Sequence, residues 1–202
     1  DNGPENTGPA SRERLDDEST GPGFGSFASV GTTGGRRGRK RSLLQGGIGV
    51  PFIARWPGRI KAGAVDDVTP LTAVDLLPTL CALAGAKLPE DYSPDGVDQS
   101  AALLGTPSPT RDKPIFWQWH SASPRGDDWP ALAARQGEWK LLLGKKSQAA
   151  ELFRFPGDAL EKVNLSQSQP AEVDRLRALL DAWQATLPNQ ANKACFSSQR
   201  SR

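Results

Sequence analysis

Residues 38–58 read G-R-K-R-S-L-L-Q-G-G-I-G-V-P-F-I-A-R-W-P-G, and the rest of the chain is organised around them. The stretch begins with cationic side chains on both sides of Lys40 and runs into the turn Gly46-Gly47. A cation beside a backbone that can approach a ligand closely is what a site for an oxyanion needs. The apolar run 48–54 after the turn predicts a buried strand, which ends at a Trp-Pro-Gly breaker.

The composition limits both the size of the fold and the classes of partner. The chain has 202 residues, enough for one domain or slightly more, and 21 Gly and 17 Pro predict many loops. Lys and Arg number 25 against 23 Asp and Glu, and this near balance argues against nucleic-acid binding. No apolar stretch approaches the roughly 20 residues that span a bilayer, so a membrane is not an expected partner. Cys81 and Cys195 are too few for a disulfide framework.

The chain contains no Met and opens on a polar turn, Asp1-Asn2-Gly3-Pro4. We therefore expect it to be the downstream part of a longer polypeptide. Residues 1–35 have the composition of an irregular segment, which could serve as a long active-site loop when it is attached to a scaffold. The tail 189–202 has no pattern and is expected to be mobile.

Residues 71–85 predict a helix, because apolar residues recur with helical spacing at positions 73, 76, 77, 80, 83 and 84. Gly85 suits the position just past the helix end, and Pro78 is expected in its first turn. Cys81 is expected to be an ordinary buried thiol.

The second half of the chain predicts a small sheet closed by a helix. A short helical piece is expected around 101–104, followed by a strand within 113–120. Segments 131–135 and 138–143 predict a hairpin across Gln136-Gly137, and 150–155 a further strand. Residues 170–187 predict an amphipathic helix with Pro170 in its first turn. Antiparallel strands closed by such a helix make an α+β unit.

Three segments carry a resemblance to the sulfatase family, the formylglycine-dependent sulfuric ester hydrolases. Residues 38–58 resemble the family block G-K-x-x-x-x-E-G-G-x-R-x-P-x-x-x-x-W-P-G, and residues 74–85 resemble its V-D-L-L-P-T-L-C-A-L-A-G helix. The pattern L-Y-D-L-x-x-D-P-x-E-x-x-N-L is recognisable from Glu151 to Leu165. The similarity is to the arylsulfatase and N-acetylgalactosamine-6-sulfatase group.

The resemblance implies an α/β, alkaline-phosphatase-like fold of which this chain is the C-terminal portion. Residues 1–86 would be the last strand and helix of the large catalytic domain. Residues 87–188 would be a small α+β subdomain with an antiparallel sheet and a C-terminal helix. The main part of the large domain would be an upstream domain of the same polypeptide.

The resemblance also implies the residues of a sulfate site. Asp1 and Asn2 would be ligands of Ca²⁺ or Mg²⁺, hard ions that prefer oxygen ligands, although Asp-Asn-Gly alone is commonly just a turn. Lys40 would contact the sulfate, whereas the alternative is that residues 36–41 form a solvated basic run. His120, the single histidine, could line the substrate pocket, but a histidine at a strand end is more often structural.

This sequence departs from the family pattern in two ways. Gln45 replaces the usual Glu of the E-G-G-x-R block and Gly49 replaces the usual Arg, which indicates the loss of a structural salt bridge or an altered site. The sequence also contains no C/S-x-P-x-R motif, whose Cys or Ser becomes the formylglycine nucleophile. We therefore expect the nucleophile in the upstream part, and no turnover by this chain alone.

The sequence thus predicts a segment of an enzyme that hydrolyses a sulfate monoester on a sugar or aryl group. One alternative is a phosphodiesterase or phosphonate hydrolase of the same superfamily with a similar metal site. Another is a non-catalytic remnant that binds polyanions through residues 36–41. The resemblance alone implies a periplasmic or secreted protein.

Overall fold

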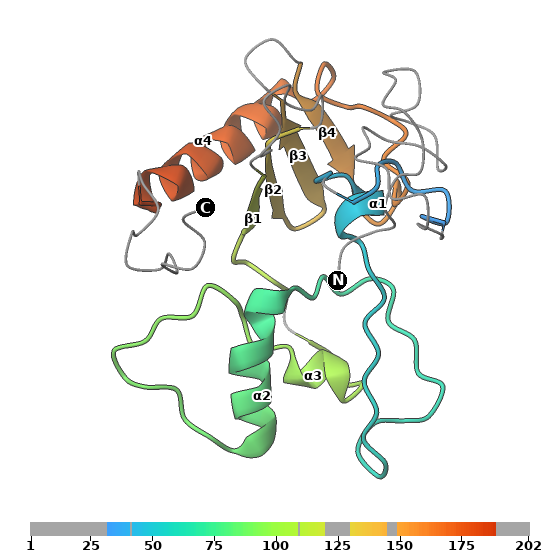
Figure 1. Cartoon of the computed structure of the whole chain (residues 1–202), viewed down its shortest axis with the longest axis vertical. Helices are drawn as coiled ribbons and strands as arrows, with labels where there is room; N and C mark the ends of the chain where they lie inside the picture. Colours follow the sequence, from blue (N-terminus) through green and yellow to red (C-terminus); the bar gives the residue numbers. More distant parts are fainter. Residues whose placement is uncertain (1–31, 41, 109, 120–129, 145–148, 189–202) are drawn as a thin grey trace, which may run out of the picture.

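The computed structural model describes residues 32–40, 42–108, 110–119, 130–144 and 149–188. It forms two lobes (Figure 1). We call residues 32–48 and 110–188 the sheet lobe, and residues 49–108 the helical lobe. The helices are α1 (Gln45–Ile48), the 3₁₀ helix η2 (Ala73–Asp75), α2 (Leu76–Ala84), α3 (Ser100–Leu103) and α4 (Pro170–Thr186). The strands are β1 (Ile115–Gln118), β2 (Leu132–Gln136), β3 (Trp139–Leu143) and β4 (Glu151–Arg154).

The four strands form one antiparallel sheet in the order β1-β2-β3-β4. Gln136 pairs with Trp139, and Gly137 in the turn between them has a φ of 58°, which a residue without Cβ adopts without strain. Both predicted hairpin strands and the two predicted outer strands are confirmed. Because side chains alternate along a strand, the sheet presents two apolar faces, and each face is covered by a different segment.

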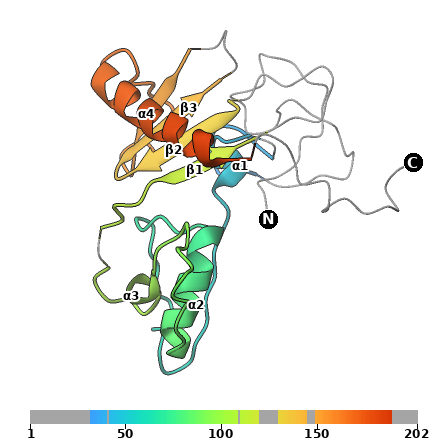
Figure 2. The same cartoon turned by 90° about the vertical axis from the view of Figure 1, so that its left-hand side faces the viewer.

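Helix α4 covers one face of the sheet and crosses in front of the strands in Figure 2. Its buried residues Val173, Leu176 and Leu180 pack on a core that includes Leu141 and Leu152. Trp183 stacks on Phe116 of β1, with ring centroids 5.0 Å apart. Pro170 lies in the first turn of the helix, as the sequence predicted, and the helix ends at Thr186, one residue before the predicted end.

The opposite face of the sheet is covered by the residues just before α1. Leu43 and Leu44 are buried against Leu142 and Phe153, and Ile48 packs at the margin of the same cluster. The segment that includes Lys40 is therefore part of the sheet lobe. The domain boundary after residue 86 stays a prediction, but residues 43–44 contribute to the core of the sheet.

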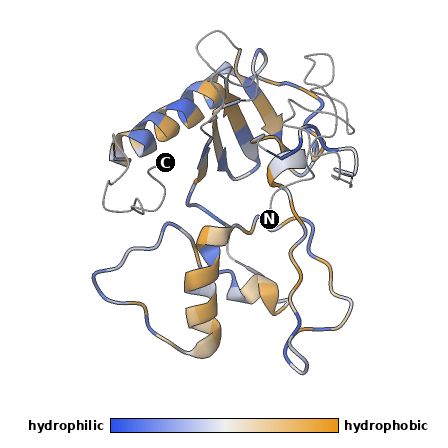
Figure 3. Ribbon diagram, in the orientation of Figure 1, coloured by the Kyte–Doolittle hydropathy of each residue, from blue (hydrophilic) through white to orange (hydrophobic). Residues whose placement is uncertain are grey.

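Helix α2 forms where the sequence predicted it. Pro78 is its third residue, and Gly85 ends it in the left-handed conformation with a φ of 68°. Much of its apolar stripe is exposed, however, including Leu77 at 49% and Leu80 at 58%. Cys81 is half-buried, so the expectation of a buried thiol is met only in part. The hydropathy colouring in Figure 3 shows α2 as a mostly apolar helix.

The predicted buried strand over 48–54 is wrong. Gln45–Ile48 forms the short helix α1, and residues 49–56 run extended without joining the sheet. Phe52 is 52% exposed and Ile53 is 89% exposed. A strand needs a neighbour to satisfy its backbone groups, and the described part of the chain places none beside this segment. An apolar run without such a neighbour stays exposed. Within the described residues, no helix is long and apolar enough to cross a membrane.

Candidate sulfate-site loop around Lys40

Of the four site residues that the sequence singled out, the structure describes one. Asp1, Asn2 and His120 lie outside the described residues, and Lys40 lies in the loop that precedes α1. Within the described residues, no group of three or more His, Cys, Asp or Glu could hold a metal ion. The structure therefore tests how Lys40 is held, and it does not test the metal ligands or the pocket role of His120.

The loop that includes Lys40 wraps tightly around the two glycines of α1. A Cβ at Gly46 would lie 2.1 Å from the carbonyl oxygen of Gly38, and one at Gly47 would lie 2.2 Å from that of Ser42. The Gly46 N–H donates to the Arg37 carbonyl at 2.7 Å. Glycine is required at both positions because the loop backbone takes the space of a side chain. The Gly-Gly pair thus fixes the path of residues 36–39 and of Ser42.

The described residues of the basic run differ in how far they are packed into the fold. Arg39 is only 3% exposed, Lys40 is half-buried, and Arg36 is exposed. The Ser42 N–H donates to the Arg39 carbonyl at 3.0 Å, which makes a tight turn at Lys40. Among residues 36–40, Arg39 is therefore packed in the interior, and the polyanion-binding alternative stays a prediction.

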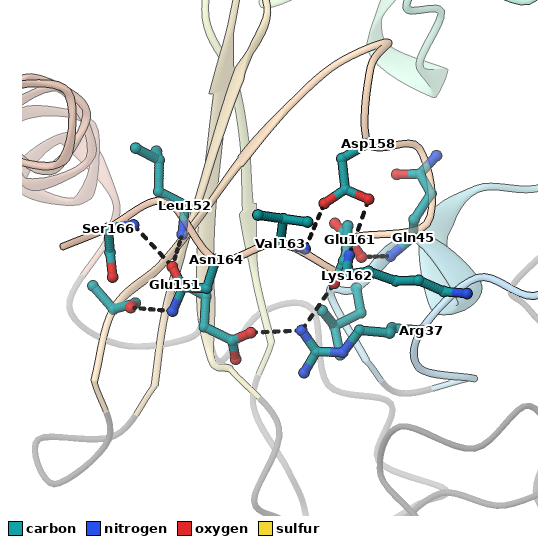
Figure 4. A network of polar contacts seen from close by, with 12 residues as sticks. Arg37, Gln45, Glu151, Leu152, Asp158, Glu161, Lys162, Val163, Asn164 and Ser166 are labelled. Carbon is teal, nitrogen blue, oxygen red and sulfur yellow. Dashed lines mark hydrogen bonds and ion pairs between the residues drawn. The ribbon is translucent and has the colours of Figure 1, made fainter. Parts of the chain in front are cut away.

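Arg37 ties the loop to the sheet, as Figure 4 shows. Its Nη1 donates to the Glu151 carboxylate of β4 at 2.7 Å and to the backbone carbonyl of Glu161 at 3.1 Å. Charge-assisted hydrogen bonds to a carboxylate are among the stronger ones in proteins. Arg37 therefore joins the loop to two segments more than 100 positions away in the sequence.

Glu161 is the central residue of this anchor. Its carboxylate is fully buried, accepts a bond from the Gln45 N–H at 2.6 Å, and pairs with Lys140 of β3 at 2.6 Å. Burial lowers the pKa of Lys140, and the neighbouring Glu161 carboxylate opposes that shift. A buried pair of this kind must stay complete, because a single charge left behind would be strongly unfavourable. Glu161 thus links the first residue of α1 to the sheet.

The segment that presents Glu161 is organised by two short polar side chains, also drawn in Figure 4. The Asp158 carboxylate accepts from the N–H groups of Lys162 and Val163. The Asn164 side-chain oxygen accepts from the N–H groups of Leu152 and Ser166. Glu161 itself has a φ of 57°, an uncommon conformation for a residue with a side chain. These bonds hold Glu161 in that conformation beside the Lys40 loop, by which we mean the described residues of 36–42.

The two departures from the family pattern are neighbours in space. A Cβ at Gly49 would lie 2.5 Å from the side-chain nitrogen of Gln45. The Gly49 N–H also donates to the Gln45 carbonyl at 2.7 Å. Side chains at these positions would meet across one helical turn, in agreement with the loss of a salt bridge. The backbone bond from Gln45 to Glu161 is kept without it.

The family pattern recognised from Glu151 to Leu165 includes Glu161 and Asn164, but the sequence analysis assigned them no role. It also assigned no role to Arg37 or Lys140. One signal for Lys140 was present: it occupies a core-facing position in the alternation of the strand W-K-L-L-L. A lysine at such a position requires a buried acidic partner. The partner, 21 residues away, could be identified only from the structure.

Several known proteins are similar to this chain. No protein-family model matches the sequence. Arylsulfatase A of Bos taurus is 38% identical over 120 residues, covering 59% of this chain and 22% of that protein. The N-acetylgalactosamine-6-O-sulfatase of Bacteroides thetaiotaomicron is 27% identical over 160 residues, covering 72% of this chain and 29% of that protein. The crystal structure of Ps i-CgsB in complex with k-i-k-neocarrahexaose matches with a TM-score of 0.56 and 30% identity, covering 70% of this chain and 30% of that one.

These similarities, together with the four-stranded antiparallel sheet, indicate a portion of a sulfatase. The chain belongs to the sulfatase family and corresponds to its C-terminal portion, with an alkaline-phosphatase-like fold. It spans between a fifth and a third of the length of the relatives above, 22% of the bovine enzyme and 29% of the bacterial one.

Proposed function

We propose that this chain forms part of a sulfatase that hydrolyses a sulfate monoester on a sugar or aryl group, with Lys40 contacting the sulfate. The supporting observation is the anchoring of the Lys40 loop. Two glycines fix its path, and Arg37 and Glu161 join it to the sheet. A lysine used in electrostatic catalysis must be held in place before the reaction, because reorganisation at that moment costs rate.

Asp1 and Asn2 are proposed as ligands of Ca²⁺ or Mg²⁺. Such an ion, when bound, would polarise the sulfate oxygens. Lys40 would provide a compact charge for a non-bridging or developing oxygen of the same group. The formylglycine nucleophile and further metal ligands would come from an upstream domain, and His120 is proposed for the substrate pocket.

The named relatives support the proposed substrate class. One is an arylsulfatase, one acts on an N-acetylgalactosamine 6-O-sulfate by its name, and the solved structure holds a neocarrahexaose. A sulfated sugar is therefore the first substrate to test, and an aryl sulfate the second. A periplasmic or secreted location is proposed from the family alone.

The test uses the reading frame extended upstream of Asp1 and an aryl sulfate as substrate. The extended protein should contain C-x-P-x-R or S-x-P-x-R and turn over the sulfate, whereas the 202 residues alone should not. Lys40→Gln should lower kcat/KM by about a hundredfold to a thousandfold, the range seen when one preorganised donor is removed. Lys61→Gln, at a helical-lobe lysine, is the matched control and should leave the rate unchanged.

Two results would overturn the proposal. Turnover by the pure 202-residue chain would contradict the expected upstream nucleophile. A preference of the extended protein for a phosphodiester, with a bare Thr or Ser in place of the motif, would assign it to the phosphodiesterase branch of the superfamily.

A further inference from the structure

A second candidate site lies between the two lobes. A cavity of about 450 Å³ is lined by residues 68–70 of the helical lobe, by the chain leading into β1, and by the β2–β3 hairpin. None of residues 32–48 lines it, so it is separate from the Lys40 loop. Two of its lining side chains are guanidinium groups, those of Arg111 and Arg135.

Arg111 is fixed in place and retains an unused donor. Its side chain is 6% exposed, its Nη1 donates to the Asp75 carboxylate at 2.5 Å, and its Nε donates to the Lys113 carbonyl at 3.0 Å. Its Nη2 is buried and has no hydrogen-bond partner. A buried charged donor without a partner is costly, so an acceptor in the cavity would stabilise it.

Arg135 contributes the second guanidinium charge of the cavity. It lies in β2 with its guanidinium over the Phe155 ring, 4.7 Å from the centroid, and its Nε is buried without a partner. Burial lowers the pKa of Arg135, as does the positive charge of Arg111, while Glu161 opposes both effects. In the described part of the chain Arg135 makes no salt bridge. The cavity therefore contains an excess of positive charge.

The remaining lining favours an oxyanion carried on a compact body. Thr69, Ser108 and Thr110 contribute hydroxyl-bearing side chains, and Ile115 and Phe155 contribute apolar surface. The Glu138 carboxylate also lines the cavity, but it is paired with Arg154 at 2.8 Å. Guanidinium groups bind sulfate and carboxylate through parallel N–H bonds, which lysine cannot reproduce.

We propose that this cavity is an oxyanion-binding site in which Arg135 and the free Nη2 of Arg111 hold a sulfate or carboxylate group. The anion is either free in solution, as inorganic sulfate, or carried by a sugar ring that rests on the apolar lining. The site does not depend on Lys40, so it can be tested whether or not the chain takes part in sulfate ester hydrolysis.

The test is a calorimetric titration of the full chain with inorganic sulfate, with ionic strength held constant by chloride. Arg135→Gln should weaken the affinity for sulfate by about tenfold or more, because a hydrogen bond to a charged group is lost. Arg135→Lys keeps the positive charge but loses the parallel N–H donors of the guanidinium group. Its affinity for sulfate should therefore lie between those of the unsubstituted chain and of Arg135→Gln. Arg59→Gln is the matched control, since Arg59 is an exposed arginine 5.0 Å from the Trp56 ring, and it should leave the affinity unchanged.

Further arms separate the possible outcomes. Thermal melts in chloride alone check that Arg135→Gln remains folded, and a sulfate-dependent rise in Tm should be present in the unsubstituted chain and lost in this variant. Binding of N-acetylgalactosamine 6-sulfate more tightly than inorganic sulfate would identify a sugar-borne anion, and equal binding would identify a free one. Sulfate binding that Lys40→Gln abolishes and Arg135→Gln leaves intact would overturn this inference and support the proposed function. Failure of the unsubstituted chain to bind either anion would also overturn it.

Discussion

The two lobes differ in what fills their interiors. Every buried hydrophobic core residue in the described chain belongs to the sheet lobe, where both faces of the sheet are covered. In the helical lobe the buried side chains include the polar ones of Asp75, Thr79 and Gln99. Of the eleven large hydrophobic residues that are exposed among the described ones, ten lie between Val50 and Tyr92. The sheet lobe thus has a closed apolar core, whereas the helical lobe is held together mainly by polar contacts.

The difference in packing between the two lobes indicates what makes the candidate site rigid. The Lys40 loop is covalently continuous with the helical lobe, but its buried contacts are with the sheet. Stability within a protein is uneven, and segments with few buried apolar contacts open most easily. The role proposed for Lys40 would benefit from a place in the lobe with the closed apolar core. Substitutions in the two lobes should therefore differ in their effect on the free energy of unfolding.

Glu161→Gln should destabilise the sheet lobe by about 3–5 kcal/mol, because it leaves the buried Lys140 without its carboxylate partner. Urea unfolding followed by circular dichroism measures the change. Glu138→Gln is the matched control, since it breaks a Glu–Arg pair whose side chains are 45% and 58% exposed. Such a pair contributes at most about 1 kcal/mol. Equal losses from the two variants would contradict the role given to Glu161.

Leucine truncation should separate the lobes directly. Leu142→Ala, at a residue that is fully buried in the sheet, should cost about 2–5 kcal/mol through lost burial and a new cavity. Leu80→Ala, at a residue that is 58% exposed on α2, should change the free energy of unfolding by about 0.5 kcal/mol or less. Thermal and urea unfolding of both variants check this. A large cost at Leu80 would show that the helical lobe has a closed core after all.

Acid should weaken the polar interior of the helical lobe. Hydrogen bonds from Arg111, Val97 and Thr72 outweigh the effect of burial, and the pKa of Asp75 is lowered. The carboxylate therefore contributes stability above its unfolded pKa of about 3.9, and this is lost as pH falls through the lower folded value. Asp75→Asn should cost about 1–3 kcal/mol near neutral pH, since it leaves Arg111 without its acidic partner. The difference in stability between the variant and the unsubstituted chain should start to shrink near pH 4 and should vanish below the folded pKa of Asp75, which unfolding curves at several pH values would measure.

The sequence predicted the elements whose cause is local. The hairpin across Gln136-Gly137, helix α4 and the Gly85 end of α2 depend on turn chemistry and periodicity within a short window. The run 48–54 has an equally clear apolar pattern, but a strand is completed by a neighbour, which the described chain does not place there. Pattern alone could not distinguish a strand from an exposed extended segment.

The residues of the candidate site also divide into those that the sequence indicated and those that only the fold revealed. The turn at Gly46-Gly47 marked the close backbone approach, and Lys40 was identified through the resemblance. The residues that hold the loop, Arg37 and Glu161, are 124 positions apart, and their contact depends on the three-dimensional fold. Long-range polar contacts of this kind leave no periodic signal in a single sequence. Asp1, Asn2 and His120 stay predictions.

Amide hydrogen exchange of the full chain is the most direct test that the Lys40 loop belongs to the sheet lobe. The account predicts that the N–H groups of Gln45 and Gly46, bonded to Glu161 and Arg37, exchange as slowly as those of β2 and β3. It also predicts that residues 52–56 exchange close to unprotected rates. Rapid exchange at Gln45 and Gly46, or protection of residues 52–56 equal to that of the sheet, would contradict it.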